Sequence, residues 1–285
     1  MEVSNLSPLR TVRLAQGPVQ YLDIGEGPVL LFVHGLLVNG EMWRKVYRPL
    51  SARFRCIVPT LPLGGHTEPM QEDADLTPPG VAQLVADFMT ALNLEDVTVV
   101  ACDSGGAITQ LLAVGYPGRV GRLVLTNCDT FEHFPPPVLK PFEILFRLPG
   151  GASFFGLAVC AKSVQKLLYA LLAHAPLEPG VGDGYFGGYI QHPEVRRDAK
   201  KFILGISNHL TLGAAEHFSE FHKPVLVVWG EDDWFFTPRF GKRLAGAFPD
   251  ARFVGVKGSK TFVSEDQPEI LSTLITDFVP QPVFA

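Results

Sequence analysis

Long apolar runs are missing from this sequence, and so are several motifs that identify common protein classes. No stretch reaches the ~18 consecutive apolar residues of a membrane-spanning helix. Residues 1–20 contain no apolar core of signal-peptide length. Neither GxGxxG nor GxxxxGK[ST] occurs between a strand and a helix, so no phosphate loop is indicated. We therefore expect a cytoplasmic protein, and no cofactor is implied.

Positive charge is not in excess either. The chain has 24 Lys and Arg against 29 Asp and Glu, which gives a net charge of -5, and its pI is near 5.9. A surface for nucleic acid or for an anionic membrane usually carries a basic run, and none is visible. We expect a small, apolar organic substrate, with neither nucleic acid nor a membrane as partner, and the oligomeric state stays unknown.

Cysteine is scarce. The four cysteines are scattered, lack CxxC spacing and mostly lie in apolar surroundings, so we expect free buried thiols and no metal site. They are Cys56, Cys102, Cys128 and Cys160.

What the sequence does contain is an alternation of short β-branched runs with helix-length segments, which predicts a mostly parallel sheet covered by helices on both faces. The expected strands are 19–25, 29–35, 55–62, 97–103, 122–129, 224–233 and 251–258, and the expected helices are 79–93, 104–116, 237–247 and 268–279. The alternation stops after Asp129. We expect residues 1–130 and 222–285 to form the core, and 131–221 to form a helical cap inserted over the ligand-binding edge of the sheet.

The strongest local signal is VVACDSGGAITQLLA (99–113), an apolar strand that enters a helix through a tight turn. Small residues two positions before and after a nucleophile let such a turn hold one side chain above the sheet. Ala101 and Gly105 hold these positions around Asp103, which we therefore expect to be the catalytic residue. Ser104 is the alternative, although it would place the larger Cys102 where Gly or Ala is needed.

Four segments carry a resemblance to a known family: LLFVHGLLVNGEMWRKV (30–46), VVACDSGGAITQ (99–110), VLVVWGEDDWFFTP (225–238) and FVSEDQPEIL (262–271). In the order and spacing of these four segments, the chain resembles the α/β-hydrolase superfamily, and within it the haloalkane dehalogenase and epoxide hydrolase branch. The resemblance implies an α/β class fold, with a mostly parallel eight-stranded sheet and an inserted helical cap. It also implies that His34 is architectural, and that the amides of Leu36 and Ser104 form an oxyanion hole.

An aspartate at the elbow of this branch forms an enzyme ester, which a histidine-activated water then hydrolyses. The pattern WGxxDxxxP assigns the supporting acid to Asp233, with Asp232 as its neighbour. Some dehalogenases carry that acid after the preceding strand, where Asp129 or Glu132 could serve. The histidine position before FVSEDQPE holds Thr261, whose hydroxyl cannot activate water because its pKa is far from neutral.

Three explanations of the missing histidine stay open. Another histidine could have taken the role, and the candidates are His133, His209 and His217. Asp103 could instead act as a general base in a lyase, isomerase or cyclase, because burial under an apolar cap raises the pKa of a carboxyl group toward neutral. Finally, the protein could bind a small ligand without turnover.

The cap and the loops supply further candidates. Epoxide hydrolases protonate the opening oxygen with cap tyrosines, and Tyr169, Tyr185 and Tyr189 lie in the cap segment. Trp234, next to Asp233, is expected to face the cavity. Dehalogenases usually have tryptophan after the nucleophile and often asparagine after the His-Gly pair, whereas this chain has Ser104 and Leu36 there, which disfavours halide as the leaving group.

Overall fold

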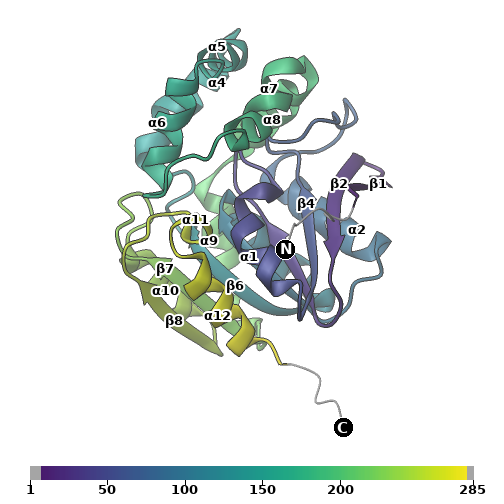
Figure 1. Ribbon diagram of the computed structural model, residues 1–285, viewed down its shortest axis with the longest axis vertical. Helices are drawn as coiled ribbons and strands as arrows, with labels where there is room; N and C mark the ends of the chain where they lie inside the picture. Colours follow the sequence, from purple (N-terminus) through teal and green to yellow (C-terminus); the bar gives the residue numbers. More distant parts are fainter. Residues whose placement is uncertain (1–7, 281–285) are drawn as a thin grey trace.

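The computed structural model describes residues 8–280, which form one eight-stranded sheet flanked by helices (Figure 1). The strand order is β1-β2-β4-β3-β5-β6-β7-β8; β2 pairs antiparallel with β1 and with β4, and all other pairs are parallel. The strands are β1 (Arg10–Leu14), β2 (Gly17–Ile24), β3 (Val29–Val33), β4 (Arg55–Thr60), β5 (Val97–Asp103), β6 (Val120–Cys128), β7 (Val225–Gly230) and β8 (Ala251–Val256). The mostly parallel sheet expected from the sequence is confirmed.

Strand β1 is the element that the sequence did not reveal. Its residues RTVRL alternate in exposure at the sheet edge, and it is short and half polar. The buried strands behave differently: every residue of β7 is buried, as the apolar run VLVVWG predicts for a central parallel strand. An edge strand is partly exposed to solvent, so its sequence has a weaker apolar pattern than that of a central strand. For this reason the sequence did not predict β1.

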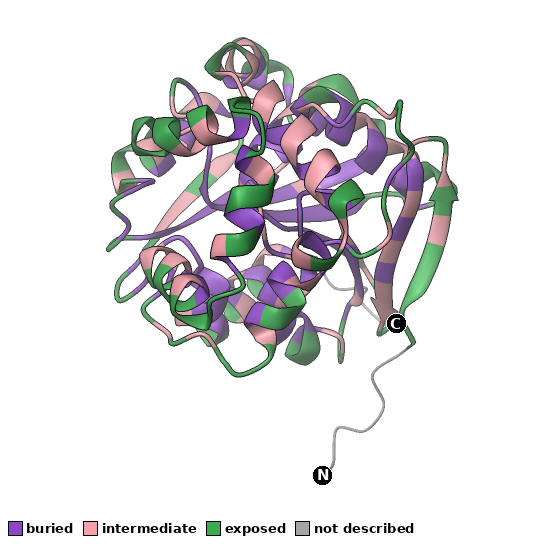
Figure 2. Ribbon diagram, turned by 90° about the horizontal axis from the view of Figure 1, so that it is seen from above, coloured by how far each residue is buried: buried purple, intermediate pink, exposed green. Residues whose placement is uncertain are grey.

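The helices α1 to α3 and α10 to α12 belong to the core, and their apolar faces bury both sides of the sheet (Figure 2). One side is packed by α2, α3 and α10, and the other by α1 and α12. Thr77 caps α2 by accepting from the Gly80 amide at 3.4 Å, and prolines occupy the first turn, where a missing amide proton costs little. The core helices are α1 (Arg44–Leu50), α2 (Pro78–Ala91), α3 (Ser104–Gly115), α10 (Pro238–Ala247), α11 (Val263–Asp266) and α12 (Pro268–Phe278).

Between β6 and β7 the chain forms helices instead of further strands of the sheet. They are α4 (Lys140–Arg147), α5 (Gly151–Ala158), α6 (Lys162–Leu172), α7 (Val181–Gln191), α8 (Pro193–Gly205) and α9 (Asn208–Glu216). Helices α4 to α8 lie beyond one edge of the sheet, whereas α9 packs against α3 (Figure 1). We name the helices α4 to α8 the cap, and the division of the chain into a core and a cap of residues 131–221 stays a prediction.

Candidate active site

The turn from β5 into α3 holds Asp103 in a strained conformation, with φ 56° and ψ -136°. A positive φ is rare for a residue with a side chain, and it is typical of a nucleophile elbow. The pairing register of β5 with β6 shifts between Ala101 and Asp103, directly before this turn. The local backbone therefore raises Asp103 out of the sheet, as the spacing of small residues predicts.

The glycines around the elbow are required by close approaches of the backbone. A Cβ atom on Gly105 would lie 2.5 Å from the carbonyl oxygen of His34, and one on Gly106 would lie 2.2 Å from the Cβ of Cys128. Gly35 is equally constrained, because an added Cβ would lie 2.5 Å from the Cβ of Asp103. The sequence SGG after Asp103 thus lets α3 start against the neighbouring turn without a clash.

Asp103 lines an apolar cavity of about 510 Å³ between the sheet edge and the cap. The polar residues in its wall are Asp103, Ser104, Asp129, Glu143, Tyr169 and Tyr185, and the remaining wall consists of Leu, Val, Ile, Phe and Pro. Cap and core both contribute, for example through Leu168 and Phe262. The cavity has the size and the apolar lining of a small-molecule site.

Burial in this cavity wall raises the pKa of the Asp103 carboxyl group above its usual value, and the amides of Ser104 and Leu36 oppose the shift. The Ser104 amide donates a hydrogen bond to Oδ1 of Asp103. The two amides that the resemblance assigns to an oxyanion hole thus act on the Asp103 carboxylate itself in this structure.

Asp129 lies beside the elbow, at the end of β6. Its amide donates to the Asp103 carbonyl at 3.3 Å, and its Oδ2 accepts from the Ser104 hydroxyl at 3.1 Å. Its Oδ1 is buried and has no hydrogen-bond partner within residues 8–280. Burial, together with the charge of Asp103, raises the pKa of Asp129 well above its usual range. Both effects favour the protonated form of the Asp129 carboxyl group.

Asp233 and Thr261 form a separate buried network behind the cavity. Oδ1 of Asp233 accepts from the amides of Phe235 and Phe236, at 2.8 and 3.0 Å. Oδ2 accepts from the Thr261 hydroxyl at 2.8 Å and from the Asn127 side chain at 2.9 Å. Burial raises the pKa of Asp233, and these donors oppose the shift.

Thr261 thus occupies the hydrogen-bonding position next to the acid that a catalytic histidine would need, and it donates to that acid. Neither Thr261 nor Asp233 lines the cavity. Asn127 was missed by the sequence analysis. In the sequence, Asn127 could have been noticed as a polar residue near the end of an apolar strand. In the structure, its side chain also forms hydrogen bonds with the backbone of Gly230.

No histidine lines the cavity within the described part of the chain. His133 is half-buried and its Nε2 donates to the Phe235 carbonyl at 2.7 Å, while His209 and His217 are exposed. His217 pairs with Glu220 at 2.9 Å. The proposed relocation of the catalytic base to one of these three residues therefore finds no geometric support, because none of them lines the cavity and local partners hold His133 and His217 elsewhere.

His34 has a structural position. It donates from Nδ1 to the Gly35 carbonyl at 2.8 Å, and its Nε2 accepts from the Leu61 amide at 2.7 Å. Burial lowers the pKa of His34 to about 4, so the ring is neutral and both nitrogens are used.

Among the cap tyrosines, Tyr169 and Tyr185 line the cavity, whereas Tyr189 donates to the Ala152 carbonyl at 2.9 Å and does not. The hydroxyls of Tyr169 and Tyr185 are buried and have no hydrogen-bond partner among residues 8–280. Burial and the charge of Glu265 raise the pKa of Tyr185 well above its usual range. Both phenols therefore remain protonated donors.

Trp234 does not line the cavity, against expectation, and 51% of its surface is exposed. The Asp233 carboxylate accepts from the amides of Phe235 and Phe236, and in this turn Phe235 and Phe236 line the cavity instead. The other two acids considered also lie outside the cavity wall. Glu132 pairs with Arg243 at the surface, and Asp232 pairs with His174.

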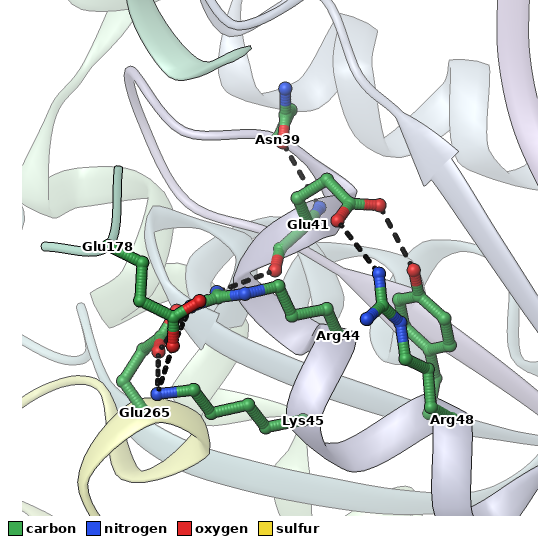
Figure 3. A network of polar contacts seen from close by, with 8 residues as sticks. Asn39, Glu41, Arg44, Lys45, Arg48, Glu178 and Glu265 are labelled. Atoms are coloured by element: carbon green, nitrogen blue, oxygen red, sulfur yellow. Dashed lines mark hydrogen bonds and ion pairs between the residues drawn. The ribbon is translucent and has the colours of Figure 1, made fainter. Parts of the chain in front are cut away.

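An ionic cluster joins Glu178 of the cap to α1 and α11 of the core (Figure 3). Glu265 is fully buried and pairs with Arg44 and, at 3.0 Å, with Lys45. The same two cations pair with Glu178 of the cap at 3.0 and 2.9 Å. The cluster thus links α1 and α11 to Glu178, which follows the cavity-lining Leu177.

Comparison with known proteins identifies the family of this chain. Residues 28–268 match the family profile described as alpha/beta hydrolase fold. The chain belongs to this family. Haloalkane dehalogenase 2 of Mycobacterium tuberculosis is 26% identical over 274 residues, which cover 92% of each chain. An uncharacterized protein of the same species is 32% identical over 300 residues and covers 96% of this chain and 84% of its own.

Solved structures show the same fold. The haloalkane dehalogenase DbeA from Bradyrhizobium elkani superposes with a TM-score of 0.78 over 95% of this chain and 96% of its own, at 17% identity. The α/β-hydrolase family, together with its dehalogenase relatives, supports a hydrolase-type enzyme.

Proposed function

We propose that this α/β-hydrolase is an enzyme that acts on a small, largely apolar organic molecule through proton transfer by Asp103. The observation that supports this proposal is that Asp103 and Asp129 both line the apolar cavity, whereas no histidine within residues 8–280 lines it. Burial raises the pKa of Asp103, which makes its carboxylate a stronger base than that of an exposed aspartate.

Asp129 completes the proposed machinery as the acid. Burial and the charge of Asp103 raise the pKa of Asp129 well above its usual range, whereas the amides of Ser104 and Leu36 stabilise the Asp103 carboxylate. Two neighbouring carboxyl groups with different pKa values can share the roles of base and acid, as in other acid pairs. Asp103 would remove a proton from the substrate and the protonated Asp129 would return one, which describes an isomerase, a cyclase or a lyase.

The pH dependence tests these roles. Turnover should rise as Asp103 ionises and fall as Asp129 ionises, which gives a bell whose two limbs both lie above the usual carboxyl range. Asp129→Asn should reduce kcat by about 10²–10⁴-fold and remove the alkaline limb. A profile with an unchanged alkaline limb in Asp129→Asn would contradict the assignment of the acid.

The first experiment combines ligand discovery with isotope exchange. Small apolar carbonyl compounds that raise the melting temperature are incubated with the protein in deuterated buffer, and deuterium incorporation is measured by mass spectrometry. We expect incorporation by the wild type and by Asp73→Asn, a control at an exposed loop position. Asp103→Asn should bind the same compounds without exchange. Binding without exchange by the wild type would leave a ligand-binding protein as the better account.

A second candidate is ester chemistry at Asp103, which the haloalkane dehalogenase relatives favour. Asp103 would displace a leaving group or open an epoxide, and the resulting ester would persist because Thr261 cannot activate water. Intact-mass analysis after incubation with alkyl halides and epoxides, followed by peptide mapping, tests this reaction. A lasting adduct on Asp103 that Thr261→His releases would establish ester chemistry and overturn proton transfer as the main reaction.

A further inference from the structure

Exposed large apolar side chains concentrate at one part of the cap. Eleven such residues occur in the described chain, and seven of them lie within residues 137–173. Leu157 and Phe154 on α5 are the most exposed, at 72% and 63%. The seven residues are Val138, Leu139, Ile144, Leu148, Phe154, Leu157 and Leu167. Helices α4, α5 and α6 lie at the end of the molecule farthest from the sheet, so their outer faces form one end of the protein (Figure 1).

The same segment is positively charged, although the chain as a whole carries a net charge of -5. Residues 137–173 contain four basic residues, all exposed, and one acidic residue, Glu143. Arg147 pairs with Glu143, and Lys162 pairs with Asp183. Lys140 and Lys166 form no ion pair with any described residue. Apolar side chains surrounded by lysines are complementary to the surface of an anionic bilayer.

This segment also forms part of the cavity wall. Leu139 lines the cavity and is itself 36% exposed, and Leu168 lines it next to the exposed Leu167. The apolar side chains of this face and of the cavity wall thus belong to the same segment, so a bilayer at this face would lie next to the cavity wall.

No helix in residues 8–280 is long and apolar enough to cross a membrane alone. Helices α5 and α6 reach that length and composition only as a pair, and they are bent by 97°. Such a pair can lay its exposed side chains into the headgroup region.

We propose that the face formed by residues 137–173, here named the cap-tip face, docks on the surface of an anionic phospholipid bilayer. Docking would place the cavity next to apolar molecules dissolved in the lipid. Only this delivery of substrate rests on the proposed function, whereas docking itself does not depend on it. The proposal reverses the expectation of no membrane partner, which was based on the absence of a contiguous basic run.

Vesicle co-sedimentation of the full chain tests the proposal. The probes are vesicles of phosphatidylcholine alone and vesicles with equal parts of phosphatidylcholine and phosphatidylglycerol, each at low and high salt. We expect binding to the anionic vesicles that weakens with salt, and little binding to the neutral ones.

Two variants and a matched control locate the surface. Phe154→Ser combined with Leu157→Ser should weaken partitioning at least about tenfold, because both side chains are exposed apolar groups. Leu9→Ser combined with Ile270→Ser removes two exposed apolar residues elsewhere and should not change binding. Lys140→Glu combined with Lys166→Glu should remove the preference for anionic lipid.

The outcomes separate docking from its alternatives. Absence of binding to either vesicle, or equal binding by wild type and Phe154→Ser/Leu157→Ser, would overturn the proposal. The proposal would also be overturned if light scattering showed a dimer of the wild type that becomes a monomer in Phe154→Ser/Leu157→Ser, while vesicle binding stays unchanged. The cap-tip face would then join two copies of the chain. Melting temperatures equal to the wild type show that the variants are folded. Vesicle binding by the inactive Asp103→Asn would show that docking stands even if the proposed reaction fails.

Discussion

Replacement of Thr261 by valine tests whether this residue now serves structure rather than catalysis. Valine has nearly the same shape, so the change leaves no cavity and removes one of the hydrogen bonds to the buried Asp233 carboxylate. A hydrogen bond to a charged group contributes about 1.5–3 kcal/mol to stability. Three donors to Asp233 remain, from Asn127, Phe235 and Phe236. We expect the free energy of unfolding to fall by an amount within that range.

The pH dependence of this loss has a definite sign. Burial already raises the pKa of Asp233 above 3.8, and removal of the Thr261 donor raises it further. A carboxyl group whose pKa is raised by folding binds protons more readily in the folded state, so its ionisation lowers stability as pH rises. The deficit of Thr261→Val should therefore grow as pH rises through the pKa of Asp233 in the folded protein, and should be smaller in mildly acidic buffer.

Urea denaturation at neutral and at mildly acidic pH measures both effects. Thr90→Val is the control, because the Thr90 hydroxyl is exposed and bonds only the Ala86 carbonyl within α2. Its effect should stay within about 0.5 kcal/mol. A Thr261→Val protein as stable as this control would refute the structural role. Loss of turnover without loss of stability would instead point to a catalytic hydroxyl.

The remaining predictions concern packing, the ionic cluster and the thiols. Gly105→Ala should lower stability by about 1–3 kcal/mol, seen as a lower melting temperature, since the new Cβ would meet the His34 carbonyl. Arg44→Met should cost up to about 3–5 kcal/mol in chemical denaturation, because it removes one of the two cations that pair with the buried Glu265 and leaves only Lys45; a neutral result would contradict the role of the cluster. Alkylation of the native protein followed by mass spectrometry should label Cys160 and spare the other three cysteines, which are buried and whose thiol pKa values are raised.

Local sequence determined the main sheet and the elbow. Apolar runs such as VLVVWG specify buried parallel strands because both of their faces are covered. Ala101 and Gly105 identified Asp103, since the strained turn depends on small residues at fixed spacing. The absence of a histidine after His222 was equally visible in the sequence.

Only the tertiary structure decided which polar groups meet. Asp129 and Asp103 are distant in sequence and become neighbours because β5 and β6 are adjacent and parallel. The sequence assigned no role to Asn127, because its contact with Asp233 forms only when β6 and β7 lie side by side. The prediction that Trp234 faces the cavity was wrong. The direction of a side chain in this loop depends on the hydrogen bonds between the Asp233 carboxylate and the amides of Phe235 and Phe236. Sequence spacing thus sets the local backbone, whereas burial and partners, which control pKa and chemistry, arise only when separate segments pack together.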